Sequence, residues 1–203
     1  MSKSRLEAFS DGVIAILITI MVLELPMPEG TTWEALRGVL PALLAYALSF
    51  VYLGIYWNNH HHMLAAVHLI NGTTLWANLH LLFWLSLIPF TTAWMSEHDF
   101  PVVPTAVYGV VLLVAAVSYT VLQGTLLRAE GNQSLLRPAI GRDLKGKISP
   151  LLYCLGIALS FAQPRLGLAV YVAVAVMWFV PDRRVERRIT ATHEGDRGRS
   201  PQP

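Results

Sequence analysis

The feature that most constrains this chain is a series of long apolar runs. A helix needs about 20 apolar residues to cross the roughly 30 Å of hydrocarbon in a bilayer. Four runs reach this length and two shorter ones follow; the six are Leu6–Leu25, Leu36–Trp57, Thr74–Met95, Thr105–Leu127, Ile148–Ala162 and Leu166–Val180. Only 14% of the residues are charged, compared with roughly 25% in soluble domains. We therefore predict an all-α membrane protein with six transmembrane helices, in which the two short runs suit thin or tilted spans or a buried hairpin.

Positive charge is concentrated in three parts of the chain. Lys3 and Arg5 precede the first run, and two basic clusters lie within residues 128–147 and 183–199. An even number of spans places all three on one side of the membrane, and an excess of Lys and Arg marks the cytoplasmic side. We therefore expect a multi-pass protein of the cell inner (plasma) membrane, embedded in the lipid bilayer, with both termini in the cytoplasm.

This charge pattern also predicts the domain organisation. Residues 1–181 are expected to form the transmembrane domain, and residues 182–203 a basic, partly disordered cytoplasmic tail. No groove-reading motif accompanies the basic clusters, so nucleic acid is not expected as a partner.

Few residues are suited to binding a metal. The single cysteine, Cys154, excludes an intrachain disulfide and a cysteine-based zinc site. The cluster His60-His61-His62 at the end of the second run could ligate a metal, or it could donate hydrogen bonds to buried carboxylates and carbonyls. Membrane di-iron enzymes need several histidine clusters, and the other histidines of this chain are scattered. We therefore expect no metal and no cofactor, and a membrane metalloenzyme is the less favoured alternative.

Asp11 is a carboxylate inside the first apolar run. If Ser10 or Asp11 capped a helix that begins at Gly12, only Val13–Leu25 would remain, which is about 20 Å of helix and too short to span. The helix must therefore begin near Arg5, with Asp11 inside it near the cytoplasmic interface. Because an ionisable group in a span costs several kcal/mol unless it is paired, we expect Asp11 to have a partner, and Arg5 is one candidate.

The third run contains two polar residues and a proline. Asn78 and His80 are polar residues in this otherwise apolar run, and they could join the polar groups around His60. Pro89 is expected to kink the helix or to mark a local break.

Three sequence blocks together carry a family resemblance. They are Arg5-Leu6-Glu7-Ala8-Phe9-Ser10-Asp11 with its continuation to Leu25, Trp57-x-x-His60-His61, and Asn78 to Phe90. They resemble the transmembrane protein 175 potassium channels, whose signature is Arg-x-x-x-Phe-Ser-Asp. The resemblance is strong over the first three spans, with Thr91 as a departure where the family has proline. The chain also lacks a Thr-Val-Gly-Tyr-Gly filter motif, as the family does.

The resemblance implies one six-helix unit per chain, assembly as a homotetramer, and a first helix that lines a central pore. It places the pore constriction at Ile16, followed by Thr19, Ile20 and Leu23. It also implies a structural hydrogen-bond network that holds the pore helix, with the members Arg5, Phe9, Ser10, Asp11, Trp57, His60, His61 and Asn78. The permeant ion is then expected to be K⁺, with passage of other monovalent cations.

Helical geometry is consistent with this arrangement. At 100° per residue, Ile20 and Leu23 lie within about 40° of Ile16, and Thr19 lies about 60° away. Asp11 lies about 140° from Ile16, so a helix that turns Ile16 to a pore turns Asp11 to its neighbours. Without the resemblance, ordinary packing against lipid or core would explain the same aliphatic stripe.

The expected function is a potassium-permeable cation channel with a hydrophobic gate, and not an enzyme. A narrow apolar ring of Ile16 side chains would expel water and raise the cost of ion passage. Glu24, Glu29 and Glu34 would attract cations to the outer mouth. The alternatives are a proton-coupled secondary transporter, the metalloenzyme considered above, and a non-conducting assembly protein.

Overall fold

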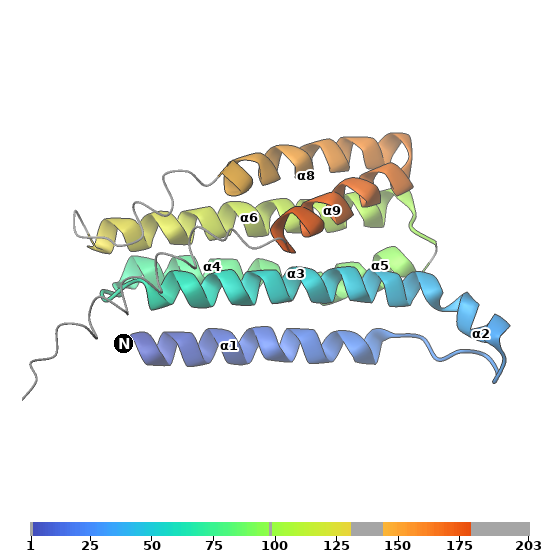
Figure 1. The fold of residues 1–203 in the computed structure, drawn as a ribbon, viewed down its shortest axis with the longest axis horizontal. Helices are drawn as coiled ribbons and strands as arrows, with labels where there is room; N and C mark the ends of the chain where they lie inside the picture. Colours follow the sequence, from blue (N-terminus) through green and yellow to red (C-terminus); the bar gives the residue numbers. More distant parts are fainter. Residues whose placement is uncertain (1, 98, 131–143, 180–203) are drawn as a thin grey trace, which may run out of the picture.

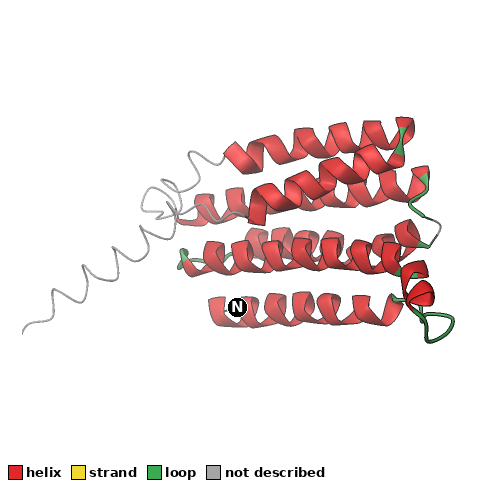
Figure 2. Ribbon diagram, turned by 45° about the vertical axis from the view of Figure 1, so that its right-hand side comes forward, coloured by secondary structure: helices red, strands yellow, loops and turns green. Residues whose placement is uncertain are grey.

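The structure is a computed structural model that describes residues 2–97, 99–130 and 144–179 of the 203-residue chain. The described residues form helices and connections, without a strand among them (Figures 1 and 2). The elements are α1 (Lys3–Ile20), η1 (Met21–Glu24), α2 (Trp33–Gly38), α3 (Leu40–Ala65), α4 (Gly72–Ser86), α5 (Ile88–Ser96), α6 (Val102–Glu130), α8 (Leu144–Ala162) and α9 (Pro164–Phe179). The cytoplasmic tail predicted for residues 182–203 lies outside the described residues.

The long helices lie side by side with nearly parallel axes, and they alternate in chain direction (Figure 1). The layer of α3, α4 and α5 lies between α1 on one side and α6, α8 and α9 on the other. The start of α1, the end of α3 and the start of α4 lie at one end of the bundle, which we call the N-terminal side. The small helix α2 extends from the opposite side.

Within the described ranges, five helical segments are long and apolar enough to cross a membrane. They are Lys3–Glu24, Leu40–Ala65, Gly72–Ser96, Val102–Glu130 and Leu144–Ala162. A sixth apolar helix, Pro164–Phe179, has 16 residues and is about 24 Å long. The predicted all-helical membrane protein is confirmed, whereas the full crossing of the sixth helix stays a prediction.

Two of the apolar runs are each divided between two helices, and a proline stands at the second position of the helix that follows each division. The third run breaks at Leu87 between α4 and α5, and Pro89 is the second residue of α5. Proline has no amide hydrogen to donate, so this position near a helix start leaves fewer backbone groups unpaired. The predicted break near Pro89 is confirmed. The second run likewise divides at Val39, and Pro41 occupies the second position of α3.

The first helix begins at Lys3, two residues before Arg5, and continues through Asp11 without interruption. The alternative in which Ser10 or Asp11 caps a shorter helix is therefore excluded. With η1, the segment reaches the length that a membrane crossing requires.

Glycines allow α6, α8 and α9 to pack closely. A Cβ atom on Gly109 of α6 or on Gly156 of α8 would overlap the ring of Tyr171 on α9. The Tyr171 carbonyl also accepts a hydrogen bond from the Tyr52 hydroxyl of α3 at 2.6 Å. This tyrosine therefore joins four helices at the centre of the molecule.

Candidate functional site

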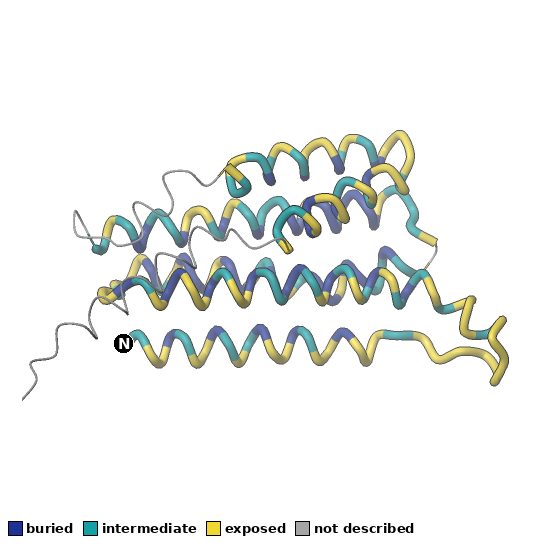
Figure 3. The backbone as a smooth tube through the Cα atoms, viewed as in Figure 1, coloured by how far each residue is buried: buried dark blue, intermediate teal, exposed yellow. Residues whose placement is uncertain are grey.

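The first helix presents two different faces (Figure 3). The buried face has residues three or four positions apart, namely Leu6, Ser10, Ile14, Leu17 and Met21. This spacing forms one stripe along a helix, and the stripe packs against α3, α4 and α5. Val13 and Ile18 at its margins are partly buried against the same core, and the remaining face of α1 is exposed.

The opposite face holds the residues predicted to form a constriction. The exposed fractions are 57% for Ile16, 40% for Ile20 and 80% for Leu23, and Thr19 is exposed as well. The Thr19 hydroxyl donates to a carbonyl of the preceding turn, with Oγ1 lying 2.9 Å from the Ile16 oxygen. Because the donor is used within the helix, the lone pairs of Oγ1 remain directed away from it. The stripe is thus aliphatic with one oxygen acceptor beside it.

A chain of buried polar groups fixes the other face of α1. The Asn78 amide nitrogen donates to Ser10 Oγ at 2.9 Å, and Asn78 Oδ1 lies 2.7 Å from His60 Nε2. Since Oδ1 can only accept, Nε2 carries the hydrogen. All three residues are almost completely buried, at 0% exposure for Ser10 and Asn78 and 1% for His60. The three residues come from α1, α4 and α3, so these bonds set the position of α1 against its two neighbours.

The other predicted members of the network lie around this chain of bonds. Asp11 is half-buried and Arg5 is exposed, and neither has a hydrogen bond or ion pair to a described residue of the same chain. Phe9 and Trp57 are each 47% exposed, and Trp57 stacks on His61 with 6.4 Å between the ring centroids. The structure thus joins Ser10, Asn78 and His60 directly, while the roles of the others stay predictions.

The acidic residues predicted at the outer mouth lie on the side opposite the N-terminus. Glu24 ends η1, Glu29 lies in the connection after it, and Glu34 lies in the first turn of α2. All three are exposed. Their carboxylates are therefore free of burial costs and available to act on ions in solution.

The histidine cluster divides between two environments. His60 is buried, whereas His61 and His62 are exposed. Among the residues described, no group of three or more His, Cys, Asp or Glu side chains could hold a metal ion.

Sequence reasoning missed a second buried polar cluster. Ser49 Oγ lies 2.6 Å from Thr92 Oγ1 and 2.9 Å from the Tyr108 hydroxyl. The cluster ties α3, α5 and α6 together. The signal available in the sequence was a hydroxyl side chain within each of three apolar runs, but the pairing required the fold.

Sequence reasoning also missed a contact on the N-terminal side. Glu130 Oε1 at the end of α6 accepts hydrogen bonds from the backbone amides of His68 and Leu69, at 2.5 and 2.8 Å. Nearby, Lys3 donates to the Ala65 carbonyl at 3.1 Å. The connection between α3 and α4 is thus attached to the end of α6, and the last residue of α3 is attached to α1.

Comparison with known proteins gives consistent results. Residues 5–89 match the family described as "Endosomal/lysosomal potassium channel TMEM175". The chain is 52% identical to a potassium channel from Chryseobacterium sp. strain P1-3 over 93% of this chain and 98% of that one. It is 30% identical to a potassium channel from Streptomyces collinus, over 87% of this chain and 91% of the relative. These relatives are named as channels, which are not enzymes.

A solved structure has the same fold. It is described as a lysosomal potassium-selective channel TMEM175 homolog from Chamaesiphon minutus, and the match has a TM-score of 0.75 at 29% identity. The match covers 88% of this chain and 96% of that one. The resemblance seen in the first three spans thus extends over most of the chain, which belongs to the TMEM175 family.

Proposed function

We propose that the protein is a subunit of a homotetrameric, potassium-permeable channel in which α1 lines a central pore. Relatives that align over nearly the whole chain are named potassium channels. The observation that carries the pore assignment is the exposed face of α1, which is aliphatic and lies opposite the face fixed by Ser10. Four copies of this face around a symmetry axis would enclose a narrow apolar path.

Ile16 is proposed as the constriction. It is a large aliphatic side chain, more than half exposed, on a helix whose opposite side is anchored by buried hydrogen bonds. A ring of such side chains excludes water when it is narrow, and an ion then lacks its hydration shell. A small rotation or outward movement of α1 would widen the ring and admit the ion, so the same residues serve as gate and filter.

Polar groups near the path favour cations. Thr19 Oγ1 is an oxygen acceptor one turn from Ile16, and Ile20 and Leu23 continue the apolar lining. Glu24, Glu29 and Glu34 would concentrate cations at the outer mouth through their field. These groups select cations over anions, and we expect K⁺ to pass with weak to moderate preference over other monovalent cations.

The buried chain His60–Asn78–Ser10 has a structural role in this proposal. It holds α1 in one rotational setting, so that the aliphatic stripe points to the axis. Phe9, Asp11 and Arg5 on α1, with Trp57 and His61 on α3, would complete the network at contacts between subunits. The exposure of Phe9 and Trp57 in the single chain supports this.

The proposed topology has six crossings and both termini in the cytoplasm. The helices alternate in direction (Figure 1), and Lys3, Arg5, Arg128, Lys145 and Lys147 all lie toward the N-terminal side. Such an excess of basic residues marks the cytoplasmic face, here of the cell inner membrane.

A flux assay tests the function. Purified protein in liposomes is given a gradient of K⁺, Na⁺ or Cs⁺, and flux is measured with and without a proton gradient. A channel gives flux that does not saturate at low ion concentration and does not depend on the proton gradient. Flux that is coupled to protons would instead indicate a secondary transporter. The absence of any ion flux from a verified tetramer would indicate an assembly protein.

A further inference from the structure

One side of α3 forms a stripe with a notch in it. Phe50, Gly54, Trp57 and His61 follow one another three or four positions apart, so they lie along one side of the helix. The two aromatic side chains, Phe50 and Trp57, are each nearly half exposed. Apart from the backbone of the helix, no heavy atom lies within 4 Å of the Cβ position of Gly54. We call this open position between Phe50 and Trp57 the notch.

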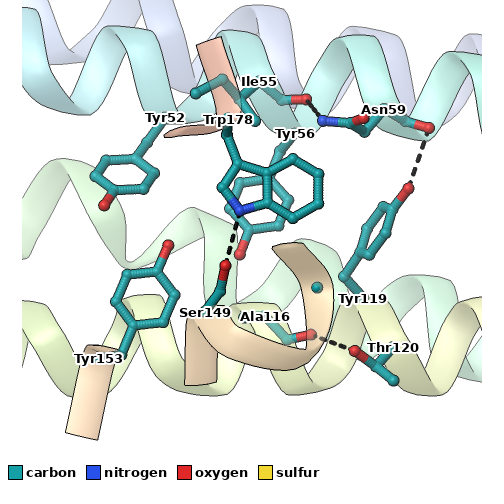
Figure 4. A pocket seen from close by; sticks show the side chains of 11 residues that line it. Tyr52, Ile55, Tyr56, Asn59, Ala116, Tyr119, Thr120, Ser149, Tyr153 and Trp178 are labelled. Atoms are coloured by element: carbon teal, nitrogen blue, oxygen red, sulfur yellow. Dashed lines mark hydrogen bonds between the residues drawn. The ribbon is translucent and has the colours of Figure 1, made fainter. Parts of the chain in front are cut away.

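Another side of α3 is covered by the chain itself. Tyr52 and Tyr56 line a cavity of about 40 Å³ that α3 shares with α6, α8 and α9 (Figure 4). The Asn59 carbonyl accepts a hydrogen bond from the Tyr119 hydroxyl at 3.2 Å. These contacts hold α3 against the third layer of helices, so the notched stripe is the side of α3 that remains exposed in the single chain.

The helix α4 carries an exposed aromatic face. Trp76 and Phe83 are seven positions apart and both are more than half exposed. His80 lies between them and is exposed as well. The Trp84 indole nitrogen donates to His80 Nε2 at 3.1 Å. Because Nε2 accepts this bond, the hydrogen of a neutral imidazole lies on Nδ1, where it has no acceptor among the described residues.

Both faces carry groups that hydrocarbon would leave unsatisfied. Trp57 and His80 each lie about 12 Å of helix from the N-terminal-side ends of α3 and α4. The Trp57 indole nitrogen has no hydrogen-bond acceptor within the described part of the chain, and His61 on the same stripe is an exposed ionisable group. Ionisable side chains in membrane spans face protein or water and avoid lipid. A protein partner therefore suits these two faces better than lipid does.

A hydrogen bond within the subunit relates the depths of the two faces in the membrane. His60 Nε2 lies 2.7 Å from Asn78 Oδ1, so these two residues are at the same depth. The helices α3 and α4 run in opposite directions (Figure 1). Gly54 precedes His60 by six residues and Phe83 follows Asn78 by five, which correspond to about 9 and 7.5 Å of helix. The notch and the Phe83 side chain thus lie at nearly the same depth.

The proposed ring brings these two faces together. The helix α1 packs against both α3 and α4, so α3 and α4 flank it when its exposed face points to the symmetry axis. A four-fold rotation then places the α3 flank of one subunit beside the α4 flank of the next, which is a heterologous contact that closes after four copies. Rotation about an axis along the membrane normal leaves the depth of every residue unchanged.

We propose that Phe83 of each subunit inserts into the notch at Gly54 of the neighbouring subunit, between Phe50 and Trp57. This contact rests on the proposed homotetramer and specifies the surfaces through which its subunits meet. Small residues let helices approach closely in a membrane, and aromatic side chains that pack together gain more than their buried area alone provides. The contact lies outside α1, so it stabilises the assembly without lining the pore.

Cysteine cross-linking tests the contact. The single native cysteine is first removed by Cys154→Ser, and Gly54→Cys is then combined with Phe83→Cys. Oxidation with copper phenanthroline in membranes should give dimers, trimers and tetramers on a non-reducing gel, because a heterologous contact links every subunit to the next. Each single variant should remain monomeric on the gel. Co-expression of the two single variants should give dimers and nothing larger.

A second cysteine pair tests the register. Trp76 is exposed on α4 but lies about 10 Å of helix from Phe83, so Trp76→Cys combined with Gly54→Cys should not cross-link. Equal cross-linking of this control pair would overturn the contact, and so would cross-linking of Phe83→Cys alone, which would indicate a two-fold contact between α4 helices. A conducting tetramer without the expected cross-link would overturn the contact and leave the proposed function intact. A protein that is monomeric before oxidation would contradict both.

Filling the notch provides an independent measurement. A Cβ atom on Gly54 meets no side chain of its own subunit, so Gly54→Leu should keep the helical content seen by circular dichroism. It should nevertheless dissociate the tetramer in detergent, as measured by light scattering after size-exclusion chromatography. Gly124→Leu on α6 is the matched control, since its Cβ position is equally open, and it should leave the tetramer intact. A Gly54→Leu variant that remains fully tetrameric would contradict the proposed contact.

Discussion

Ser10 and Ile16 lie on opposite faces of the same helix. Ser10 is completely buried and accepts a hydrogen bond from Asn78 at 2.9 Å, while 57% of the Ile16 side chain is exposed. Six residues of an α-helix turn through about 600°, which places the two side chains about 120° apart around the axis, so anchoring Ser10 determines the direction of Ile16. This relationship links a buried structural contact to the proposed gate.

Ile16→Asn should increase ion flux and lower the preference for K⁺. The amide would keep water in the narrow ring, and removal of as little as about 1.4 kcal/mol from the barrier raises the rate about tenfold. Liposome flux of K⁺ and Na⁺ would measure both effects. Leu151→Asn on the exposed face of α8 is the control. Unchanged flux in the Ile16 variant would be inconsistent with the constriction.

Asn78→Leu should destabilise the protein by about 2–3 kcal/mol. The leucine has a similar size but leaves Ser10 and His60 buried without partners, and each unsatisfied polar group costs about 1–3 kcal/mol. Thermal unfolding in detergent and size-exclusion chromatography would follow the loss of stability and of assembly. Asn58→Leu at an exposed position of α3 should change neither. A normal melting temperature for the Asn78 variant would contradict the role of the buried chain.

Gly109→Ala should also destabilise the protein, by about 1–3 kcal/mol, because the added methyl overlaps the Tyr171 ring. Gly124→Ala in the same helix is a matched control, since no atom lies within 4 Å of its Cβ position. It should be neutral or slightly stabilising, because alanine favours a helix. Thermal unfolding of the two variants side by side would test the close packing, and equal midpoints would argue against it.

Glu130→Ala should loosen the connection between α3 and α4. The carboxylate accepts hydrogen bonds from the amides of His68 and Leu69, and such charge-assisted bonds contribute about 1.5 kcal/mol or more. Hydrogen exchange of these two amides, measured by mass spectrometry, should therefore become about tenfold faster. Glu7 lies on the same side, and its carboxylate is 3.9 Å from Lys3 Nζ. Glu7→Ala should leave the exchange rates of the His68 and Leu69 amides unchanged.

Replacing Glu24, Glu29 and Glu34 together by glutamine should lower cation flux severalfold at low ionic strength. Their field concentrates cations only within a Debye length, about 10 Å at 0.1 M salt and shorter above it. The difference between the variant and the unchanged protein should therefore disappear in concentrated salt. A deficit that persists at high salt would point to a structural effect of the substitutions.

Much of the membrane fold could be predicted because it depends on local properties. The lengths of the apolar runs determined the helices, and the start of α1 near Arg5 followed from the length needed to cross the bilayer. The short helix α2 and the divisions at Val39 and Leu87 were less visible in the apolar pattern. The positions of these divisions depend on Pro41 and Pro89 and on how the helix ends pack against neighbouring helices.

The candidate site could be predicted only in part. The relative directions of Ser10 and Ile16 are fixed by helical geometry, so the sequence alone separated an inward face from an exposed stripe. The partner of Ser10 is 68 residues away, and the amides that Glu130 binds precede it by 61 and 62 residues. The two faces of α1 were therefore determined by the sequence through the fixed geometry of one helix. Which groups meet them was decided by the tertiary structure, because contacts between distant residues depend on how the helices pack.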